Sequence, residues 1–250
     1  MDSRKIQVCL SPALLPFYDK ENTVAVVIDI FRASSSICYG LANGAEAIIP
    51  VAEVDECRAY EGRMGCLLAA ERNGEVVPGF DFGNSPFSYT ANQVKGKTVV
   101  LTTTNGTRAI QQCLDASTVA IGSFLNITAL VEWLRGQDRH VLLVCAGWKN
   151  HVSLEDSLFA GAVVARLKTS SSLLDDSAHM TAALFAEARE DIAGYLNNSA
   201  HALRMRHLDL AKDIAFCLQQ DLVSTIPVLH NGRLVGLPTE GEAATTGIPA

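Results

Sequence analysis

Three apolar runs in the first part of the chain, at residues 24–30, 98–101 and 141–144, each end directly in a polar cluster. Hydrophobicity within each run is continuous rather than alternating, which predicts strands covered on both faces, as in a mainly parallel sheet flanked by helices. In such sheets, ligands bind beyond the carboxyl ends of the strands. We therefore expect the three polar clusters to meet at one composite site.

The rest of the pattern predicts a three-layer α/β/α fold with a helix-rich C-terminal part, in a single domain covering residues 1–250. Further strands are predicted at residues 47–51, 117–121 and 225–229. Helices are predicted at residues 33–41, 54–61, 106–114, 127–134, 154–167, 178–196, 200–206 and 210–219. Ser153 and Asp156 resemble a capping box at the start of the helix over 154–167. The C-terminal helices either cover the sheet or form the interface of a homodimer.

Two segments depart from this alternation. Residues 168–176 are rich in Ser and Asp and are predicted to be a linker between helices. Residues 66–93 contain several Gly and Pro residues that interrupt regular structure. The same segment carries the polar side chains of Glu71, Arg72, Asp81, Asn84 and Ser85. Because long loops in compact domains usually serve a function, we expect residues 66–93 to form such a loop beside the site.

Composition narrows the classes of function. The chain is 48% hydrophobic and 19% charged, which is typical of a globular enzyme. Its formal net charge of −7 argues against partners such as nucleic acid or an anionic membrane surface, so an anionic ligand needs local cations and backbone donors. No apolar run reaches the length of a membrane span and no secretory leader is recognised, which predicts a cytoplasmic location. The seven cysteines include no Cys-x-x-Cys pair and predict reduced thiols.

Asp29 lies near the end of the first apolar run, three residues before Arg32. A carboxylate in a buried run is costly unless it is paired, so Asp29 is an ion-pair partner of Arg32, a metal ligand or a nucleophile. Its place at the carboxyl edge of the sheet favours the last two roles. Glu71, Asp81 and Asp156 are further candidate ligands for Mg²⁺, which needs only one or two carboxylates besides water and substrate oxygens. The alternative is that these three carboxylates are solvated or interact with helix dipoles.

Two of the polar clusters open helices and contain an arginine. Arg32 precedes one helix, and Arg108 lies in the first turn of the other. Unpaired N–H groups at a helix N-terminus suit phosphate or sulfonate, although serine N-caps and a threonine-rich strand end are ordinary alternatives. The repetition with arginine favours anion binding. The candidate substrate contacts in these clusters are Ser34, Ser35, Thr104, Asn105, Gly106, Thr107 and Arg108.

Common catalytic signatures are absent from the sequence. It contains no P-loop, no Gly-x-Gly-x-x-Gly, no His-Glu-x-x-His and no Gly-x-Ser-x-Gly. A nucleotide-dependent enzyme of this fold would need such a fingerprint. A non-catalytic protein that binds small anions is the other alternative, and it would need the arginines without the set of carboxylates.

Several of these motifs together resemble one family. The segments that carry the resemblance are Val27-Ile28-Asp29-Ile30-Phe31-Arg32-Ala33-Ser34-Ser35, Glu71-Arg72, Gly79-Phe80-Asp81-Phe82-Gly83-Asn84-Ser85-Pro86, Thr102-Thr103-Thr104-Asn105-Gly106-Thr107, Cys145-Ala146-Gly147, Leu154-Glu155-Asp156 and Asp213-Ile214-Ala215-Phe216-Cys217. In this order and spacing they are similar to the 2-phosphosulfolactate phosphatases. The resemblance extends over most of the chain.

The resemblance implies a Mg²⁺-dependent hydrolase that converts 2-phospho-3-sulfolactate to 3-sulfolactate and phosphate, a step of coenzyme M biosynthesis in methanogens. In bacteria without coenzyme M, it implies sulfolactate as the product or another small phosphorylated hydroxy acid as the substrate. The expected Mg²⁺ ligands are drawn from Asp29, Glu71, Asp81 and Asp156. The expected catalytic residues are Asp29, Arg32 and Arg72. Asn84 and Ser85 join the substrate contacts.

Overall fold

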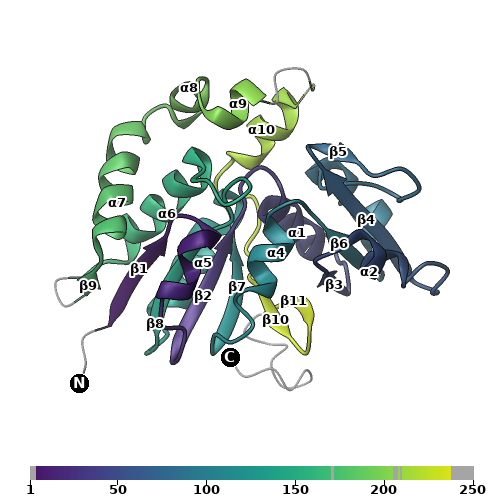
Figure 1. Cartoon of the computed structure of the whole chain (residues 1–250), viewed down its shortest axis with the longest axis horizontal. Helices are drawn as coiled ribbons and strands as arrows, with labels where there is room; N and C mark the ends of the chain where they lie inside the picture. Colours follow the sequence, from purple (N-terminus) through teal and green to yellow (C-terminus); the bar gives the residue numbers. More distant parts are fainter. Residues whose placement is uncertain (1–3, 170–171, 205–207, 209, 238–250) are drawn as a thin grey trace.

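The computed structural model describes residues 4–169, 172–204, 208 and 210–237, and it confirms an α/β fold with a large, mostly parallel sheet (Figure 1). The strands described are β1 (Lys5–Cys9), β2 (Thr23–Ile28), β3 (Ala47–Pro50), β4 (Cys66–Arg72), β5 (Glu75–Val76), β6 (Thr98–Thr102), β7 (Thr118–Gly122), β8 (His140–Cys145), β9 (Leu173–Leu174), β10 (Pro227–His230) and β11 (Arg233–Gly236). Their order in the sheet is β5-β4-β6-β3-β11-β10-β7-β2-β8-β1-β9.

The sheet consists of two parallel halves joined by an antiparallel hairpin. Strands β7, β2, β8, β1 and β9 pair in parallel in one half. In the other half, β3, β6 and β4 pair in parallel and the short β5 runs antiparallel to β4. The hairpin of β10 and β11 lies between them, where Val228 pairs with Ala120 of β7 and Leu234 pairs with Ile48 of β3.

Helices cover both faces of this sheet (Figure 1). The helices described are α1 (Ala33–Ala42), α2 (Val54–Arg58), α3 (Ala91–Val94), α4 (Gly106–Gln111), α5 (Ile127–Arg135), α6 (Leu154–Leu167), α7 (Asp176–Ala188), α8 (Ile192–Leu196), α9 (Ala200–Arg204) and α10 (Ala211–Cys217), with 3₁₀ turns at Pro12–Phe17, Pro86–Ser88 and Phe124–Asn126. None of the described helices is long and apolar enough to cross a bilayer.

Strand β2 shows why the apolar runs are continuous. Val24, Val26 and Ile28 pack into one core with α5, α6 and α7. Ala25 and Val27 point to the opposite face and pack into a second core with α1 and α4. Since successive side chains of a strand alternate between faces and both faces are covered, every position in β2 is buried.

Several predicted boundaries are wrong. The strand predicted over 24–30 ends at Ile28, and the segment 66–93, predicted as a loop, begins with β4. The predicted helix 178–196 is two helices, because the Asp191 side chain accepts a hydrogen bond from the Gly194 amide and starts α8. The predicted linker contains β9, and the strand predicted over 225–229 is the first strand of a hairpin. Arg206, inside one predicted helix, lies outside the described residues.

The predicted capping box at α6 does not form, since Ser153 makes no side-chain capping bond. The C-terminal helices take two positions. Helices α6 and α7 pack against the sheet, whereas α8, α9 and α10 arch over one end of it (Figure 1). That end is the carboxyl edge of β2, where residues of α9 and α10 contact the loop that follows this strand. The homodimer stays a prediction.

Candidate active site

Asp29 leaves β2 at the carboxyl edge of the sheet, and its carboxylate lies between the first turns of two helices. Oδ1 accepts a long hydrogen bond of 3.4 Å from the Ala33 amide at the start of α1. On the other side is Gly106, at the start of α4, where an added Cβ would come within 2.7 Å of Asp29 Oδ2. Burial, and then the charges of Asp156 and Glu71, raise the pKa of Asp29 to about 8.

Glu71 is the second-last residue of β4, and its side chain connects this strand to the loop after β6. Its Oε2 accepts a hydrogen bond of 3.1 Å from the Thr104 amide, and its Oε1 accepts one of 3.2 Å from the Thr104 hydroxyl. Oε1 also accepts from the Gly74 amide. The side chain is buried, so β4, which the sequence did not predict, places a second fixed carboxylate at the same edge as Asp29.

Asp29 and Glu71 line one small cavity of about 20 Å³. The other residues around it are Phe31, Arg32, Gly74, Asn84, Asn105, Trp148, His201 and Leu210. Oδ1 of Asn84 is buried without a hydrogen-bond partner. A volume of this size holds about one water molecule or ion. The cavity therefore brings two carboxylates and an unsatisfied amide oxygen together around the space of a single small ligand.

Arg32 is held against this cavity by the C-terminal part of the chain. Its guanidinium forms a buried ion pair with Asp213 of α10, and Nη2 donates to the Gly74 carbonyl at 2.8 Å. Asp213 also accepts a hydrogen bond of 2.9 Å from the Ser85 hydroxyl. The alternative prediction, an ion pair between Asp29 and Arg32, is wrong, because the Arg32 guanidinium pairs with Asp213 instead.

Most of the predicted hydroxyl contacts serve the backbone of the loops instead of lining the cavity. The Ser34 hydroxyl donates to the Asp29 carbonyl at 2.8 Å, and the Ser35 hydroxyl donates to the Ile30 carbonyl at 3.1 Å. Thr107 exchanges hydrogen bonds with Thr103. These bonds fix the turns that lead from β2 into α1 and from β6 into α4.

Two predicted charged residues, Arg72 and Asp81, lie apart from the cavity lining. Arg72 donates to the Glu71 carbonyl at 2.7 Å and to Thr102 Oγ1 at 2.9 Å. Asp81 is exposed and accepts from the Leu68 amide at 2.7 Å, in the middle of β4 rather than at its carboxyl end. The structure thus brings Asp29 and Glu71 together and leaves Asp81 outside.

Asp156 is buried beneath the site and joins two of its loops. Oδ1 accepts from the Ile30 amide at 2.9 Å and Oδ2 from the Gly147 amide at 3.0 Å. Burial, and then the charge of Glu155, raise the pKa of Asp156 to about 7. The two carboxylate oxygens of Asp156 therefore connect the segments that follow β2 and β8 through hydrogen bonds.

The residues that cover the cavity from the C-terminal side, His201 and Leu210, were not predicted from the sequence. His201 of α9 lines it, and the His201 Nδ1 lies 3.3 Å from Oε1 of Glu155, while the other oxygen of Glu155 is buried without a partner. Burial, and then the charges of Arg204 and Arg32, lower the pKa of His201 to about 4, so its imidazole is neutral at physiological pH. No sequence pattern indicates where these short helices dock.

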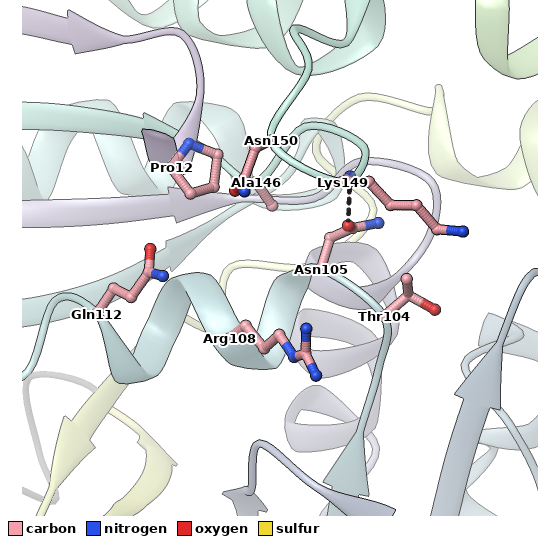
Figure 2. Close-up of a pocket in the computed structure, with 8 residues that line it drawn as sticks. All are labelled: Pro12, Thr104, Asn105, Arg108, Gln112, Ala146, Lys149 and Asn150. Atoms are coloured by element: carbon pink, nitrogen blue, oxygen red, sulfur yellow. Dashed lines mark hydrogen bonds between the residues drawn. The ribbon is translucent and has the colours of Figure 1, made fainter. Parts of the chain in front are cut away.

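A larger recess of about 360 Å³ adjoins the small cavity (Figure 2). Its lining residues are Pro12, Thr104, Asn105, Arg108, Gln112, Ala146, Lys149 and Asn150. Asn105 lines both spaces, and its Oδ1 accepts a hydrogen bond of 3.0 Å from the Lys149 amide. Arg108 forms an exposed ion pair with Glu53 at 2.8 Å. Lys149 was missed, although it follows the third polar cluster closely.

An α/β sheet with paired carboxylates and cations at its carboxyl edge defines a class of enzymes that act on small anionic substrates. The family model of 2-phosphosulpholactate phosphatase matches residues 9–232. A Thermotoga petrophila protein named probable 2-phosphosulfolactate phosphatase is 42% identical over 222 residues, covering 89% of this chain and 96% of the relative. Proteins of the same name from Caldanaerobacter subterraneus and Clostridium acetobutylicum are 38% and 36% identical, covering 85% and 92% of this chain and 90% and 100% of the relatives. The chain belongs to the 2-phosphosulpholactate phosphatase family.

Proposed function

We propose that this chain is a Mg²⁺-dependent phosphatase that hydrolyses 2-phospho-3-sulfolactate to 3-sulfolactate and phosphate. Family membership supports the reaction class and the substrate. The observation that carries the proposal is the small cavity, which is lined by Asp29, Glu71, Arg32 and Asn84, the last with a buried Oδ1 that has no hydrogen-bond partner. Phosphate monoesters hydrolyse very slowly without a catalyst, and catalysis of phosphoryl transfer consists mainly of positioning and charge neutralisation.

The donor set suits Mg²⁺. Within the described residues, no three His, Cys, Asp or Glu side chains form a group that could hold a metal ion alone. Mg²⁺ does not need one, because it commonly takes one or two carboxylates, substrate oxygens and water. Asp29, Glu71 and Asn84 offer oxygen atoms as ligands, and the unpartnered amide oxygen of Asn84 would gain a partner if it held a cation. Bound there, Mg²⁺ would neutralise charge on the phosphoryl group.

In this proposal, Arg32 and Asp29 have different roles. Arg32 presents a guanidinium whose orientation is fixed by Asp213, and it contacts a phosphoryl oxygen from the side of α10. Asp29 has two open roles: metal ligand, or nucleophile that attacks phosphorus directly. A phosphorylated enzyme trapped by acid quench in wild type and absent in Asp29→Asn supports the nucleophile, whereas loss of Mg²⁺ affinity in the same variant supports the ligand.

The test is phosphate release from a panel of phosphorylated hydroxy acids that includes 2-phosphosulfolactate and 2-phospholactate, in Mg²⁺ and in EDTA. We expect Mg²⁺-dependent release that is fastest with the sulfonate, and its loss in Asp29→Asn. Asp138→Asn removes the same charge at an exposed position and should keep wild-type activity. Fastest release from another panel member would assign that acid as the substrate. No release from any member by folded protein would overturn the proposal.

We also propose that the reaction takes place in the cytoplasm. All seven cysteines are free in the structure, six of them buried, which suits a reducing compartment. Labelling of the denatured protein, isolated under alkylating conditions, should find seven reduced thiols. A disulfide between any two of them would argue against this location.

A further inference from the structure

The recess of Figure 2 is positively charged although the protein is acidic. The residues that line it include Arg108 and Lys149 and no Asp or Glu, whereas the whole chain carries a formal charge of −7. In the view of Figure 2, the Lys149 side chain extends on the side of Thr104, the Arg108 side chain lies below Asn105, and Pro12 and Gln112 lie on the opposite side from Lys149. Two cations beside a concave space, in a chain of this net charge, indicate a local anion site.

The two spaces differ in size in a way that orients the substrate. The cavity of about 20 Å³ beside Asp29 and Glu71 is too small for a three-carbon phosphorylated acid, whereas the recess of about 360 Å³ can hold one. Thr104 and Asn105 connect them, because Thr104 binds Glu71 and Asn105 lines both spaces. A substrate whose phosphoryl group reaches the carboxylates can therefore place its non-reacting end in the recess.

Lys149 is the cation best suited to the sulfonate at that end. Its backbone is held in the left-handed region, at φ 47°, by the hydrogen bond from its amide to Asn105 Oδ1. Its ammonium lies 5.2 Å from the centre of the Trp148 ring and has no hydrogen bond or ion pair with any residue that the structure describes. Arg108, in contrast, is already paired with Glu53.

The chemistry of the two cations is compatible with this assignment. An ammonium is a compact charge with three donors that can bind the tetrahedral oxygens of a sulfonate, whereas the planar fork of Arg108, which could bind either a carboxylate or a tetrahedral oxyanion, is engaged by Glu53. We infer that Lys149 binds the sulfonate and thereby selects a phosphorylated acid that carries a second strong anion. The inference rests on the proposed phosphatase function and names a residue that sets its substrate preference.

The test compares Lys149→Met with Lys97→Met, a matched change at another exposed lysine. For Lys149→Met, kcat/KM with 2-phosphosulfolactate should fall about tenfold, while the loss with 2-phospholactate, which lacks the sulfonate, is much smaller. Lys97→Met should match wild type on both substrates. Equal losses on the two substrates, or no loss on either, would overturn the inference.

Direct binding separates this inference from the proposed function. Titration calorimetry with 3-sulfolactate and with lactate measures binding affinity in the recess without turnover. We expect Lys149→Met to weaken sulfolactate binding about tenfold, with a much smaller effect on lactate. If the wild type releases no phosphate yet binds sulfolactate through Lys149, the phosphatase proposal fails and the sulfonate site stands. Sulfolactate affinity that is the same in both proteins would refute the sulfonate site.

Discussion

The charge of Asp29 should make the metal-free protein lose stability as the pH rises. Burial, together with the charges of Asp156 and Glu71, raises the pKa of Asp29 from 3.8 to about 8 in the folded chain. Between these two values the folded state holds a proton that the unfolded state has released. Below about pH 4, Asp29 is protonated in both states and does not lower the free energy of unfolding. Above this pH, the free energy of unfolding falls as the pH rises toward the pKa of Asp29 in the folded state.

The magnitude follows from the width of this window. Each pH unit within it costs about 1.4 kcal/mol, so the change from about pH 5 to about pH 8 costs at most ~4 kcal/mol. In a chain of this size, that loss lowers the midpoint of thermal unfolding by roughly 10 °C. Asp29→Asn cannot ionise, so its stability should fall less with pH, and it should exceed the wild type near pH 8 in EDTA.

The assay is urea unfolding followed by circular dichroism across this pH range, with EDTA present throughout. Asp138→Asn serves as the control, because Asp138 is exposed and should retain the wild-type pH dependence. Adding Mg²⁺ near pH 8 should stabilise the wild type and have little effect on Asp29→Asn, since a ligand stabilises only the state that binds it. If the wild type and Asp29→Asn lose stability in parallel, Asp29 does not carry the buried charge and the reasoning is refuted.

Three further changes test the geometry of the site. Gly106→Ala would place a Cβ 2.7 Å from Asp29 Oδ2, so kcat should fall at least about tenfold with a stability loss of about 1–3 kcal/mol in urea; a wild-type kcat would contradict the packing. Asp213→Ala leaves Arg32 buried without its partner and should cost about 3 kcal/mol of unfolding free energy, so a change below about 0.5 kcal/mol would contradict the ion pair. The Asp81→Asn variant should release phosphate at a rate within about twofold of the wild-type rate. If phosphate release by this variant no longer depended on Mg²⁺, Asp81 would be a metal ligand.

The sequence predicted the parallel strands β2, β3, β6, β7 and β8, whose apolar runs are covered on both faces, but it missed β1 at Lys5–Cys9. It missed β4 because the glycines and prolines that follow Arg72 obscured a short apolar run at residues 66–70. It also missed the β10–β11 hairpin, although Asn231 and Gly232, with φ of 50° and 75°, form the two-residue turn that the pair Asn-Gly indicates between strands. Local signals were present in both places.

The site was predictable from the fold where residues follow strands directly, and Glu71 and Asn84 were expected from the polar segment 66–93 and the family resemblance. Asp29 and Asn105 follow β2 and β6, so their meeting at one edge was expected from a parallel sheet. His201, Leu210 and Asp213 reach the same place from short helices whose docking depends on tertiary packing. The predicted hydroxyls of Ser34 and Ser35 are used by the backbone, a competition that residue type alone does not reveal.

The charges around the small cavity give a physical reason for a divalent cation. Asp29 and Glu71 are acidic, and the positive charge of Arg32 is already compensated by Asp213. His201 adds no charge, because its lowered pKa of about 4 keeps the imidazole neutral. A phosphate dianion that approaches this cavity is repelled by both carboxylates. Protonation of Asp29 removes only one of the two charges, whereas a bound divalent cation would offset both and leave Asp29 charged for catalysis.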